Sequence, residues 1–463
     1  MRIKVSNQLY VTNPTPELAA WCKKNLVLPN PDYAKKQRMG FWVGNTPKEL
    51  CLYEVHGNDL VLPYGVIEKI PIDENTRFEC EWGGLKFCDY HRYSRDIPLY
   101  HYQHIAVNKM RDSYHGILQA PAGSGKTQMG LAIIQRCMSN ALWLTHTHDL
   151  LQQSKSRAEQ YFDPDIIGTI TEGKVDIGTG ITFATIQTMC KLDLDALKYM
   201  WDIVIVDECH RVAGTPTGVT MFSKVLNHLA APRKYGLSAT VHRADGLIKA
   251  TYALLGEVAY TVPREAVAER VMPVTVIPVP TGVRISDECL NTDGTLNYAG
   301  MINYCTTNYL RNVQIASAIV TDAQHPSLIL SDRLAHLETL MSMLPGDLRD
   351  DAVMISGRMT SKKGKAEREQ AIEDMRSGKK KYLFATYALA KEGLDIPCLE
   401  RLYMATPQKD RAVVEQAVGR IARTCEGKAD PICYDFVDEI GYLQKAWRTR
   451  KGIYKKCGCT VKE

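Results

Sequence analysis

Two adjacent carboxylates are the most informative chemical feature of this sequence. Residues 203–210 read Ile-Val-Ile-Val-Asp-Glu-Cys-His, so Asp207 and Glu208 follow four β-branched residues. Such a run is typical of a strand buried on both faces of a parallel sheet, and α/β folds bind ligands at the carboxyl ends of these strands. One carboxylate can hold Mg²⁺ on a nucleotide while the next orients or deprotonates the attacking water. We therefore predict a Mg²⁺–nucleotide site, with Asp207 as the metal ligand and Glu208 as the catalytic group.

A second segment carries the residue types that bind phosphate. Residues 120–127 read Ala-Pro-Ala-Gly-Ser-Gly-Lys-Thr and lie between an expected strand and an apolar helix at 129–138. Backbone N–H groups at Gly123, Ser124 and Gly125 are expected to curl around phosphates, helped by the positive end of the helix. Lys126 would reach the β- and γ-phosphates, and Thr127 would offer its hydroxyl to Mg²⁺. Ala120 departs from the strict pattern, which has glycine at that position.

A third segment supplies positive charge. Residues 416–423 read Gln-Ala-Val-Gly-Arg-Ile-Ala-Arg. On a helix, Gln416, Arg420 and Arg423 stand at i, i+4 and i+7 and share one face. Nucleotide hydrolases of this kind need arginines supplied across the nucleotide cleft, so we interpret this face as arginine fingers rather than as a solvated basic surface. The opposite stripe, expected to face the core, consists of Val414, Ala417, Val418 and Ile421.

Two series of short apolar strands alternate with helical stretches and must position these residues. Such alternation predicts an α/β fold with two doubly wound parallel sheets. The segment 261–281 contains four prolines and reads as the connector between them. The first series is expected at 116–120, 141–146, 180–186, 203–206 and 235–239, and the second at 327–331, 352–356, 382–386, 401–405 and 432–436.

Composition sets the broad class. The 463 residues are 45% hydrophobic and 24% charged, as in ordinary proteins that bury real cores. The net charge of +5 permits a nucleic-acid partner without requiring one. No signal peptide and no run of about 20 apolar residues is visible, so we expect a cytoplasmic protein and no membrane partner. The fourteen cysteines are scattered and show no complete tetrahedral metal set, although Cys457 and Cys459 stand close together.

The two ends of the chain differ from its middle. The first 97 residues read as a small α+β module, with a helix at 16–24 and strands at 1–5, 50–55 and 59–62. Basic and aromatic residues mix at positions 35–42 of this module, which fits duplex or junction binding, while a plain packing domain is nearly as well supported. We divide the chain into this module (1–97), an ATP-binding domain (98–266), a second sheet domain (267–440) and an exposed basic tail (441–463).

The order of these segments resembles helicase superfamily 2 across residues 98–440. The resemblance begins at residues 99–103 (Leu-Tyr-His-Tyr-Gln) and continues through the phosphate loop, 144–147 (Leu-Thr-His-Thr) and 180–189. It runs on through the Asp207 segment, 236–240 (Gly-Leu-Ser-Ala-Thr), 328–337, 384–386, 393–395 and the Gln416 helix. It implies two tandem RecA-like domains that use ATP and Mg²⁺.

The resemblance also implies roles for further residues. Gln103 would read the adenine, with Tyr100 where the family often has arginine, and Gly393 and Asp395 would contact the nucleotide. His210, Ser238 and Thr240 would couple the nucleotide site to nucleic acid. The implied DNA contacts are Thr145, Thr185 and Thr386.

The segment 238–246, with its Ser-Ala-Thr and Arg-Ala-Asp-Gly, is similar to the repair and recombination branch that includes the phage UvsW-like helicases and the XPB translocases. This resemblance implies an ATP-dependent DNA helicase or translocase that remodels forks and junctions with little sequence preference, beside replication or recombination proteins. Two alternatives stay open, a DExH-type RNA helicase and the translocating subunit of a larger DNA-processing complex.

Overall fold

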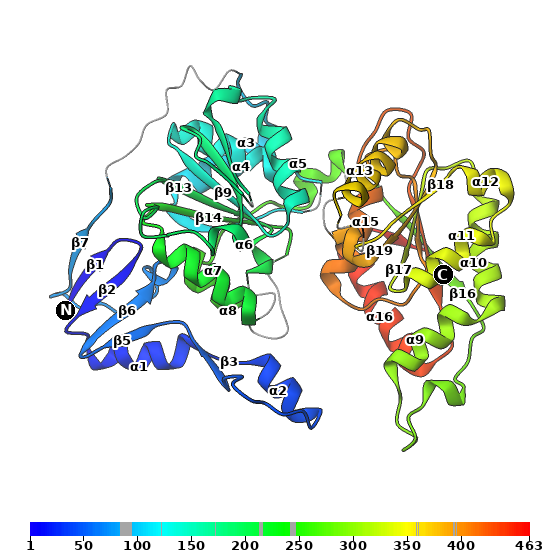
Figure 1. The fold of residues 1–463 in the computed structure, drawn as a ribbon, viewed down its shortest axis with the longest axis horizontal. Coiled ribbons are helices and arrows are strands. Elements are labelled where there is room, and N and C mark those ends of the chain that lie inside the picture. The colour runs from blue at the N-terminus through cyan, green and yellow to red at the C-terminus, as the bar shows by residue number, and fades with distance from the viewer. Residues whose placement is uncertain are drawn as a thin grey trace. The chain divides into compact units, whose positions relative to one another are not determined.

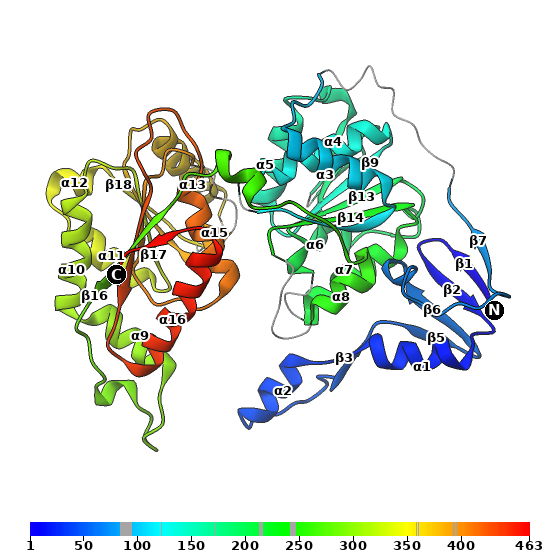
Figure 2. The same ribbon diagram turned by 180° about the vertical axis from the view of Figure 1, so that it is seen from behind.

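The computed structural model describes residues 1–83, 95–121, 123–171, 173–212, 216–240, 247–357, 359, 361–391, 394 and 396–463. They form two compact units, Met1–Ala266 and Val267–Glu463 (Figures 1 and 2). In these ranges no helix is both long and apolar enough to cross a membrane.

A small sheet with the strand order β5-β6-β2-β1-β7 opens the first unit. Its strands pair antiparallel except for β7, which runs parallel to β1. Ile3 and Val5 of β1 and Leu9 and Val11 of β2 are buried in one cluster with Leu18 of α1, as the period of two in a strand requires. The module contains β1 (Arg2–Val5), β2 (Gln8–Thr12), α1 (Pro16–Asn25), β3 (Val27–Pro29), α2 (Pro31–Arg38), β4 (Glu49–Cys51), β5 (Glu54–His56), β6 (Asp59–Pro63) and β7 (Arg77–Cys80).

This module is packed on the parallel sheet of the same unit through polar contacts. The ammonium of Lys234, which is 1% exposed, donates to the carbonyl oxygens of Asn7 at 3.0 Å and Leu226 at 2.8 Å. The Tyr64 hydroxyl donates to the carbonyl of Pro232 at 3.0 Å. The bonds to Asn7 and from Tyr64 join segments more than 150 residues apart in the chain, and the module and the parallel sheet belong to one compact unit.

The parallel sheet of the first unit has eight strands in the order β11-β10-β12-β9-β13-β14-β8-β15. All pairs are parallel except β10–β11. The five expected strands are present within two residues of their predicted bounds. The strands β10, β11 and β15 at the sheet margins were missed, because β10 and β11 lack a continuous apolar run and β15 has only three apolar residues in a row. The strands are β8 (His115–Gln119), β9 (Ala141–Thr145), β10 (Ile167–Thr171), β11 (Lys174–Asp176), β12 (Ile181–Thr185), β13 (Ile203–Asp207), β14 (Arg233–Ser238) and β15 (Val258–Thr261).

Helices cover this sheet on both faces. A Cβ on Gly130 of α4 would lie 2.7 Å from the Trp143 ring and 2.8 Å from Leu237, so glycine lets α4 approach the sheet closely. On the other face, Phe222 of α7 and Leu255 of α8 share a buried cluster with strand residues. The helices are α3 (His101–Asp112), α4 (Lys126–Cys137), α5 (His148–Ala158), α6 (Ile186–Met189), α7 (Pro216–His228) and α8 (Ile248–Leu255).

The second unit holds a seven-stranded sheet, all parallel, in the order β18-β19-β17-β20-β21-β16-β22. Leu328 and Leu330 of β17 face one buried cluster, and Ile329 between them faces the other. The α/β class with two parallel sheets is therefore confirmed, and all five expected strands are present. The strands are β16 (Thr275–Pro280), β17 (Ser327–Ser331), β18 (Ala352–Ile355), β19 (Tyr382–Thr386), β20 (Arg401–Met404), β21 (Ile432–Val437) and β22 (Thr460–Val461).

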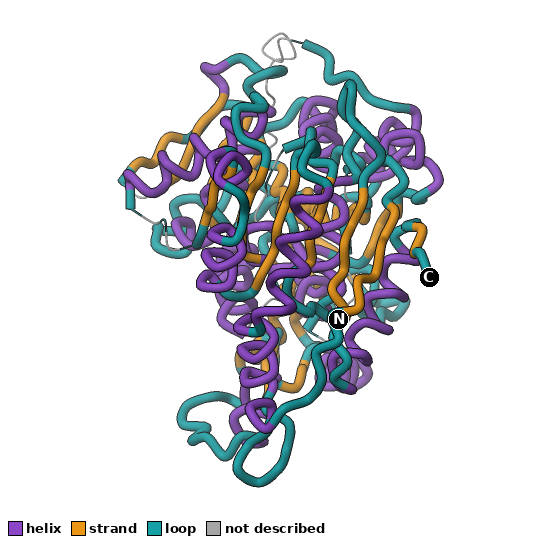
Figure 3. Tube along the Cα trace, turned by 90° about the vertical axis from the view of Figure 1, so that its right-hand side faces the viewer, coloured by secondary structure: helices purple, strands orange, loops and turns teal. Residues whose placement is uncertain are grey.

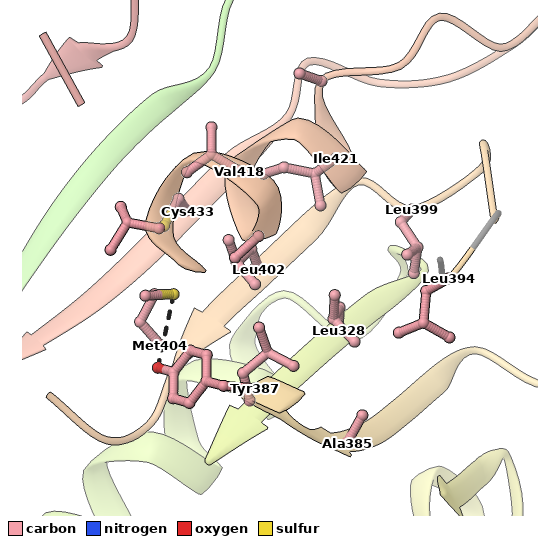
Figure 4. Close-up of a cluster of buried hydrophobic side chains, with 14 of the residues drawn as sticks. Leu328, Ala385, Tyr387, Leu394, Leu399, Leu402, Met404, Val418, Ile421 and Cys433 are labelled. Atoms are coloured by element: carbon pink, nitrogen blue, oxygen red, sulfur yellow. Dashed lines mark hydrogen bonds between the residues drawn. The ribbon is translucent and has the colours of Figure 1, made fainter. Parts of the chain in front are cut away.

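Helices flank this sheet as well, so that strands run between helical layers (Figure 3). One cluster joins Leu402 and Met404 of the sheet to Val418 and Ile421 of α15 (Figure 4). The predicted core stripe of α15 is buried as expected. The helices are α9 (Tyr298–Thr307), α10 (Tyr309–Thr321), α11 (Leu334–Ser342), α12 (Gly346–Asp350), α13 (Lys362–Arg376), α14 (Tyr387–Lys391), α15 (Arg411–Ile421) and α16 (Gly441–Lys456).

The interpretation of 261–281 as a plain connector is wrong at its end, where β16 lies inside the sheet. The backbone groups of Val276 point toward β22, because its carbonyl accepts the N–H of Lys462 at 2.9 Å. The backbone nitrogens of Pro278 and Pro280, two and four residues further along the strand, point to the same side, but β22 pairs only with Thr275 and Val276. The two missing N–H groups thus fall where β16 has no neighbour on that side, which is how prolines are tolerated in a strand.

The exposed basic tail expected at 441–463 is also a wrong prediction. This segment forms α16 and β22, and Arg450 and Tyr454 are 1% and 0% exposed. Arg450 forms a bidentate ion pair with Asp435 of β21 at 2.7 and 2.8 Å. The Tyr454 hydroxyl donates to the same carboxylate at 2.7 Å. Charge alone suggested a solvated helix, but this arginine has a buried partner.

We expect Arg450→Ala to lower the free energy of unfolding by about 3–5 kcal/mol, because it leaves the Asp435 carboxylate buried without its cation. Denaturant unfolding measures the change. Arg448→Ala is the matched control, since Arg448 is exposed on the same helix and its loss should cost within about 0.5 kcal/mol. Equal costs for the two variants would contradict the assigned role of the buried pair.

Lys234 generates a pH-dependent prediction. Burial lowers the pKa of its ammonium from 10.5 to about 7. Between these values the unfolded chain binds more protons than the folded one, so the contribution of Lys234 to the free energy of unfolding rises with pH. We expect the difference in unfolding free energy, wild type minus Lys234→Met, to grow from about pH 7 to about pH 10. A difference that stays constant over this window would show that Lys234 remains charged when folded.

Candidate functional site

The loop between β8 and α4 has the backbone needed to wrap phosphates. β8 ends at Gln119 and α4 begins at Lys126. Gly123 and Gly125 adopt φ angles of 82° and 79°, a region that side chains with a Cβ rarely occupy. These left-handed residues turn the chain directly into the first turn of α4, whose free N–H groups form an anion-binding end.

Gln103 ties the start of α3 to this loop. Its Nε2 donates to the Ser124 carbonyl at 2.9 Å, and its Oε1 accepts the Tyr100 N–H at 2.9 Å. The Tyr102 hydroxyl donates to the same Ser124 carbonyl at 3.0 Å. A Cβ on Gly125 would lie 2.5 Å from Gln103 Nε2, so the contact itself requires glycine there. The Tyr100 ring stacks on Tyr102 and is 43% exposed.

Asp207 and Glu208 point in different directions from the end of β13. Glu208 has φ 48° and ψ 49°, a left-handed conformation that costs a non-glycine residue about 1–3 kcal/mol. The Asp207 carboxylate accepts from Ser154 Oγ at 3.3 Å and from the Glu208 N–H at 2.9 Å. Glu208 Oε1 lies 3.7 Å from Lys126 Nζ. The strained turn thus aims Glu208 at the phosphate-loop lysine.

The two carboxyl groups are electrostatically unlike. Burial and the neighbouring Glu208 charge raise the pKa of Asp207 to about 6. Burial also acts to raise the pKa of Glu208, but Lys126 and His210 outweigh it and hold that pKa below its ordinary value. Glu208 is therefore the group that keeps its negative charge in this site.

A chain of polar contacts leads from Glu208 to the next strand end. His210 Nδ1 lies 3.2 Å from Glu208 Oε2 and 3.1 Å from Ser238 Oγ. Ser238 is the last residue of β14, and its hydroxyl donates to the Thr240 carbonyl at 2.6 Å. The structure thus brings together the three residues expected to couple two sites.

Ser154 of α5 is a contact of Asp207 that the sequence did not reveal. It lies 53 positions before Asp207 and belongs to no segment with a recognisable chemical pattern. A polar residue on the helix that follows β9 was the only available signal.

The three threonines expected to contact nucleic acid are the last residues of their strands, and two of them are buried while the third is half-buried. The Thr145 hydroxyl is buried and donates to the Thr147 carbonyl at 3.0 Å. Thr185 is the N-cap of α6, and its Oγ lies 2.9 Å from that of Thr188. Thr386 is half-buried at the end of β19. The hydroxyls of Thr145 and Thr185 thus already have partners within the protein. Contact of the three threonines with nucleic acid stays a prediction.

In the second unit, Gln416 and Arg420 lie on α15, but Arg423 does not. α15 ends at Ile421, and Arg423 forms an antiparallel bridge with Val271. The expectation of one shared helical face is therefore wrong for Arg423, because this pairing draws the chain out of the helix. Arg420 Nη1 donates to the Leu394 carbonyl at 2.8 Å. Gly393 and Asp395 lie outside the described residues.

No cluster of three or more potential metal-ligating His, Cys, Asp or Glu side chains occurs among the residues that the structure describes. Cys457 is half-buried and Cys459 is buried, and neither is joined in a disulfide among the described residues. The described part of the chain therefore offers no structural zinc site at its C-terminal end.

Two family models match the chain. Residues 96–243 match the res subunit of type III restriction enzymes, and residues 311–425 match the helicase conserved C-terminal domain. These are the segments that hold the phosphate loop with the carboxylate pair, and the arginine helix.

Individual relatives agree with the family models. The chain is 24% identical to the probable helicase D10 of Escherichia phage T5, covering 99% of this chain and 95% of that protein. It is 26% identical to the DNA 3'-5' translocase XPB2 of Sulfurisphaera tokodaii, over 72% of this chain and 80% of the relative. A fragment structure of an HsdR subunit of a type I restriction enzyme from Vibrio vulnificus is 18% identical, covers 81% of this chain and 71% of that one, and has a TM-score of 0.57.

Two parallel sheets, with a phosphate loop and a carboxylate pair at the strand ends of the first, define a nucleoside-triphosphate hydrolase of the RecA-like class. With the two family matches, the chain belongs to the helicases of superfamily 2 and is an ATP-hydrolysing helicase. The expected resemblance to phage helicases and to the XPB branch is confirmed.

Proposed function

We propose that this helicase acts on DNA, and that it couples ATP hydrolysis to movement that unwinds or branch-migrates forks and junctions. The observation that carries the proposal is the contact chain Lys126–Glu208–His210–Ser238, which links the phosphate loop to a neighbouring strand end. Glu208, which would respond to bound nucleotide, is thereby connected through His210 to Ser238 at the carboxyl end of β14, where a polynucleotide would lie.

The first unit would bind ATP and start its hydrolysis. Gly123, Ser124 and Gly125 would hold the phosphates through their N–H groups, and Lys126 would neutralise the β- and γ-phosphates. Glu208 would orient the attacking water and accept its proton. Gln103 and Tyr100 would position the adenine. Residues 98–266 are the proposed ATP-binding domain.

Mg²⁺ fits the oxygen groups near this loop. Magnesium in such sites takes one or two protein ligands and completes its shell with phosphate and water. Thr127 in the first turn of α4 and Asp207 at the end of β13 would be these ligands. When bound, the metal neutralises charge that develops on the transferred phosphate.

The second unit, Val267–Glu463, would contribute arginines to the hydrolysis of ATP. Gln416 and Arg420 project from α15, and Arg423 follows it in the bridge to Val271. Arginines supplied to a γ-phosphate stabilise the charge of the transition state. Gly393 and Asp395 are proposed as further nucleotide contacts.

Thr145, Thr185 and Thr386 are the proposed contacts to the DNA backbone. Hydroxyls and N–H groups at strand ends suit phosphate oxygens, which carry no sequence information. We therefore expect weak sequence preference and a strong dependence of binding on salt. The name of the XPB2 relative, a DNA translocase, supports DNA as the substrate. We further propose that the protein acts in the cytoplasm of a bacterial or phage-infected cell, beside replication or recombination proteins.

A second candidate is the motor subunit of a larger DNA-processing complex. It is favoured by the match of residues 96–243 to restriction-enzyme res subunits and by the likeness to the HsdR fragment. A motor of that kind would translocate on duplex DNA with little strand separation of its own.

The ATPase rate with different polynucleotides distinguishes these candidates. We expect forked DNA to stimulate hydrolysis more than linear duplex, and RNA to stimulate it least, all at one salt concentration. Stimulation by plain duplex equal to that by forks, with no strand separation, would favour the motor subunit. RNA stimulation above DNA would overturn the DNA assignment.

We expect Glu208→Gln to bind ATP within a few-fold of wild type and to lose about 10²–10⁴ in kcat, because the variant keeps the side-chain shape but not the base. Single-turnover hydrolysis and nucleotide-binding titrations measure the two quantities. Glu159→Gln, at the exposed C-cap position that follows α5, is the control and should hydrolyse normally. Near-normal turnover in Glu208→Gln would remove Glu208 from the catalytic role.

A further inference from the structure

An arm made of residues 27–51 extends from the N-terminal module and exposes aromatic side chains. Its base is the antiparallel pair β3–β4, and its outer part is α2 with the following turn (Figure 1). α2 buries none of its residues. Beyond it, Met39, Phe41 and Trp42 are 52%, 61% and 86% exposed. Three neighbouring large apolar side chains in water form a patch of the kind that marks a binding surface.

The tip of the arm has a defined shape. The Phe41 N–H donates to the Lys36 carbonyl at 2.9 Å, and Lys36 Nζ donates to Thr46 Oγ1 at 2.7 Å. Gly44 has φ 49°, and a Cβ there would lie 2.6 Å from the Trp42 ring. The indole therefore rests against the backbone of Gly44, while most of its surface faces solvent.

The charge of the arm selects among possible partners. The arm, residues 27–51, contains four basic side chains, on Lys35, Lys36, Arg38 and Lys48, and two acidic side chains, on Asp32 and Glu49. Lysine is depleted at protein–protein interfaces, whereas aromatic rings flanked by basic residues are the usual platform for single-stranded nucleic acid. Charge complementarity thus favours a polyanion with unpaired bases.

The root of the arm is fixed to the parallel-sheet part of the same unit. Leu28 and Leu50 pack with Val219 and Ala250. Val219 is the fourth residue of α7, and Ala250 is the third residue of α8. Helices that follow parallel strands begin at the carboxyl end of the sheet, so the arm is rooted at the same end as Asp207 and Ser238.

We propose that Trp42, with Phe41 beside it, stacks on unpaired bases at the branch point of the DNA, and that the basic residues of the arm bind the adjoining phosphates. This inference rests on the proposed function, because it names the part of the substrate that the arm recognises. Stacking reads no base edge and therefore fits a helicase without sequence preference.

Equilibrium binding of the 463-residue chain to two DNA molecules tests whether the arm binds unpaired bases. The first is a fork with 2-aminopurine at the first unpaired position, and the second is a linear duplex of equal length. Loss of one base–aromatic stack should weaken fork binding by about 5- to 100-fold in Trp42→Ala. Duplex binding should change less than two-fold, and the 2-aminopurine quenching seen with wild type should disappear.

Three further variants sharpen the test. Trp42→Phe keeps a ring and should recover part of the affinity. Val55→Ala removes another exposed apolar side chain of the same module, 62% exposed on β5, and should bind like wild type. Lys35→Gln combined with Lys48→Gln should reduce the salt dependence of fork binding and leave the quenching in place.

The outcomes separate this inference from the proposed function. Unchanged fork affinity and quenching in Trp42→Ala would overturn the proposed role of the arm in DNA binding. Equal losses on fork and duplex would overturn stacking on unpaired bases, and so would a wild-type protein that shows no quenching. A fork that is bound and quenched but leaves ATP hydrolysis unstimulated would overturn the proposed motor function alone.

Discussion

The structure of the site depends on one buried carboxylate. Glu208 lies between Lys126 at 3.7 Å and His210 at 3.2 Å, on a backbone in the left-handed region. A buried charge persists only when a partner compensates its lost hydration, so the ionised state of Glu208 depends on both neighbours. Any ligand that draws Lys126 toward its own phosphates removes one of these partners. His210, which also contacts Ser238, would then be the remaining close partner of Glu208.

The rest of the first unit keeps this carboxylate in place. β13 lies between β9 and β14, and the β-branched residues before Asp207 are buried on both faces. Gly130 allows α4, the helix that begins at Lys126, to lie close to Trp143 of the sheet. A rigid sheet is what permits a strained residue at its edge, because neighbouring packing supplies the stability that the strain costs.

The second unit uses buried charge for a different purpose. Asp435 on β21 accepts from Arg450 and Tyr454 of α16, which fastens the last helix to the sheet. β22 then pairs with β16 beyond this helix. The chain end is thus part of the sheet domain, although its composition resembles that of a solvated segment. A charged residue is an uncertain guide to exposure when its partner lies in a distant part of the sequence.

Local patterns were sufficient where the physical cause was local. The run before Asp207 predicted β13, the glycines predicted the phosphate loop, and the apolar stripe predicted the buried face of α15. They failed where the cause was a distant pairing. β16 looked like a proline-rich connector, yet its prolines face a side without a neighbouring strand, and Arg423 leaves α15 because it pairs with Val271.

The class of fold could be predicted from periodicity, glycine spacing and residue type, because these are properties of short segments, and the same patterns predict the chemistry of the nucleotide site. The tertiary structure adds which groups are neighbours: Glu208 with Lys126 and His210, Gln103 with the phosphate loop, Arg450 with Asp435, and the exposed Trp42 on a firmly rooted arm. The physical reason is that burial, hydrogen bonding and exposure depend on chain segments that folding brings together from far apart in the sequence.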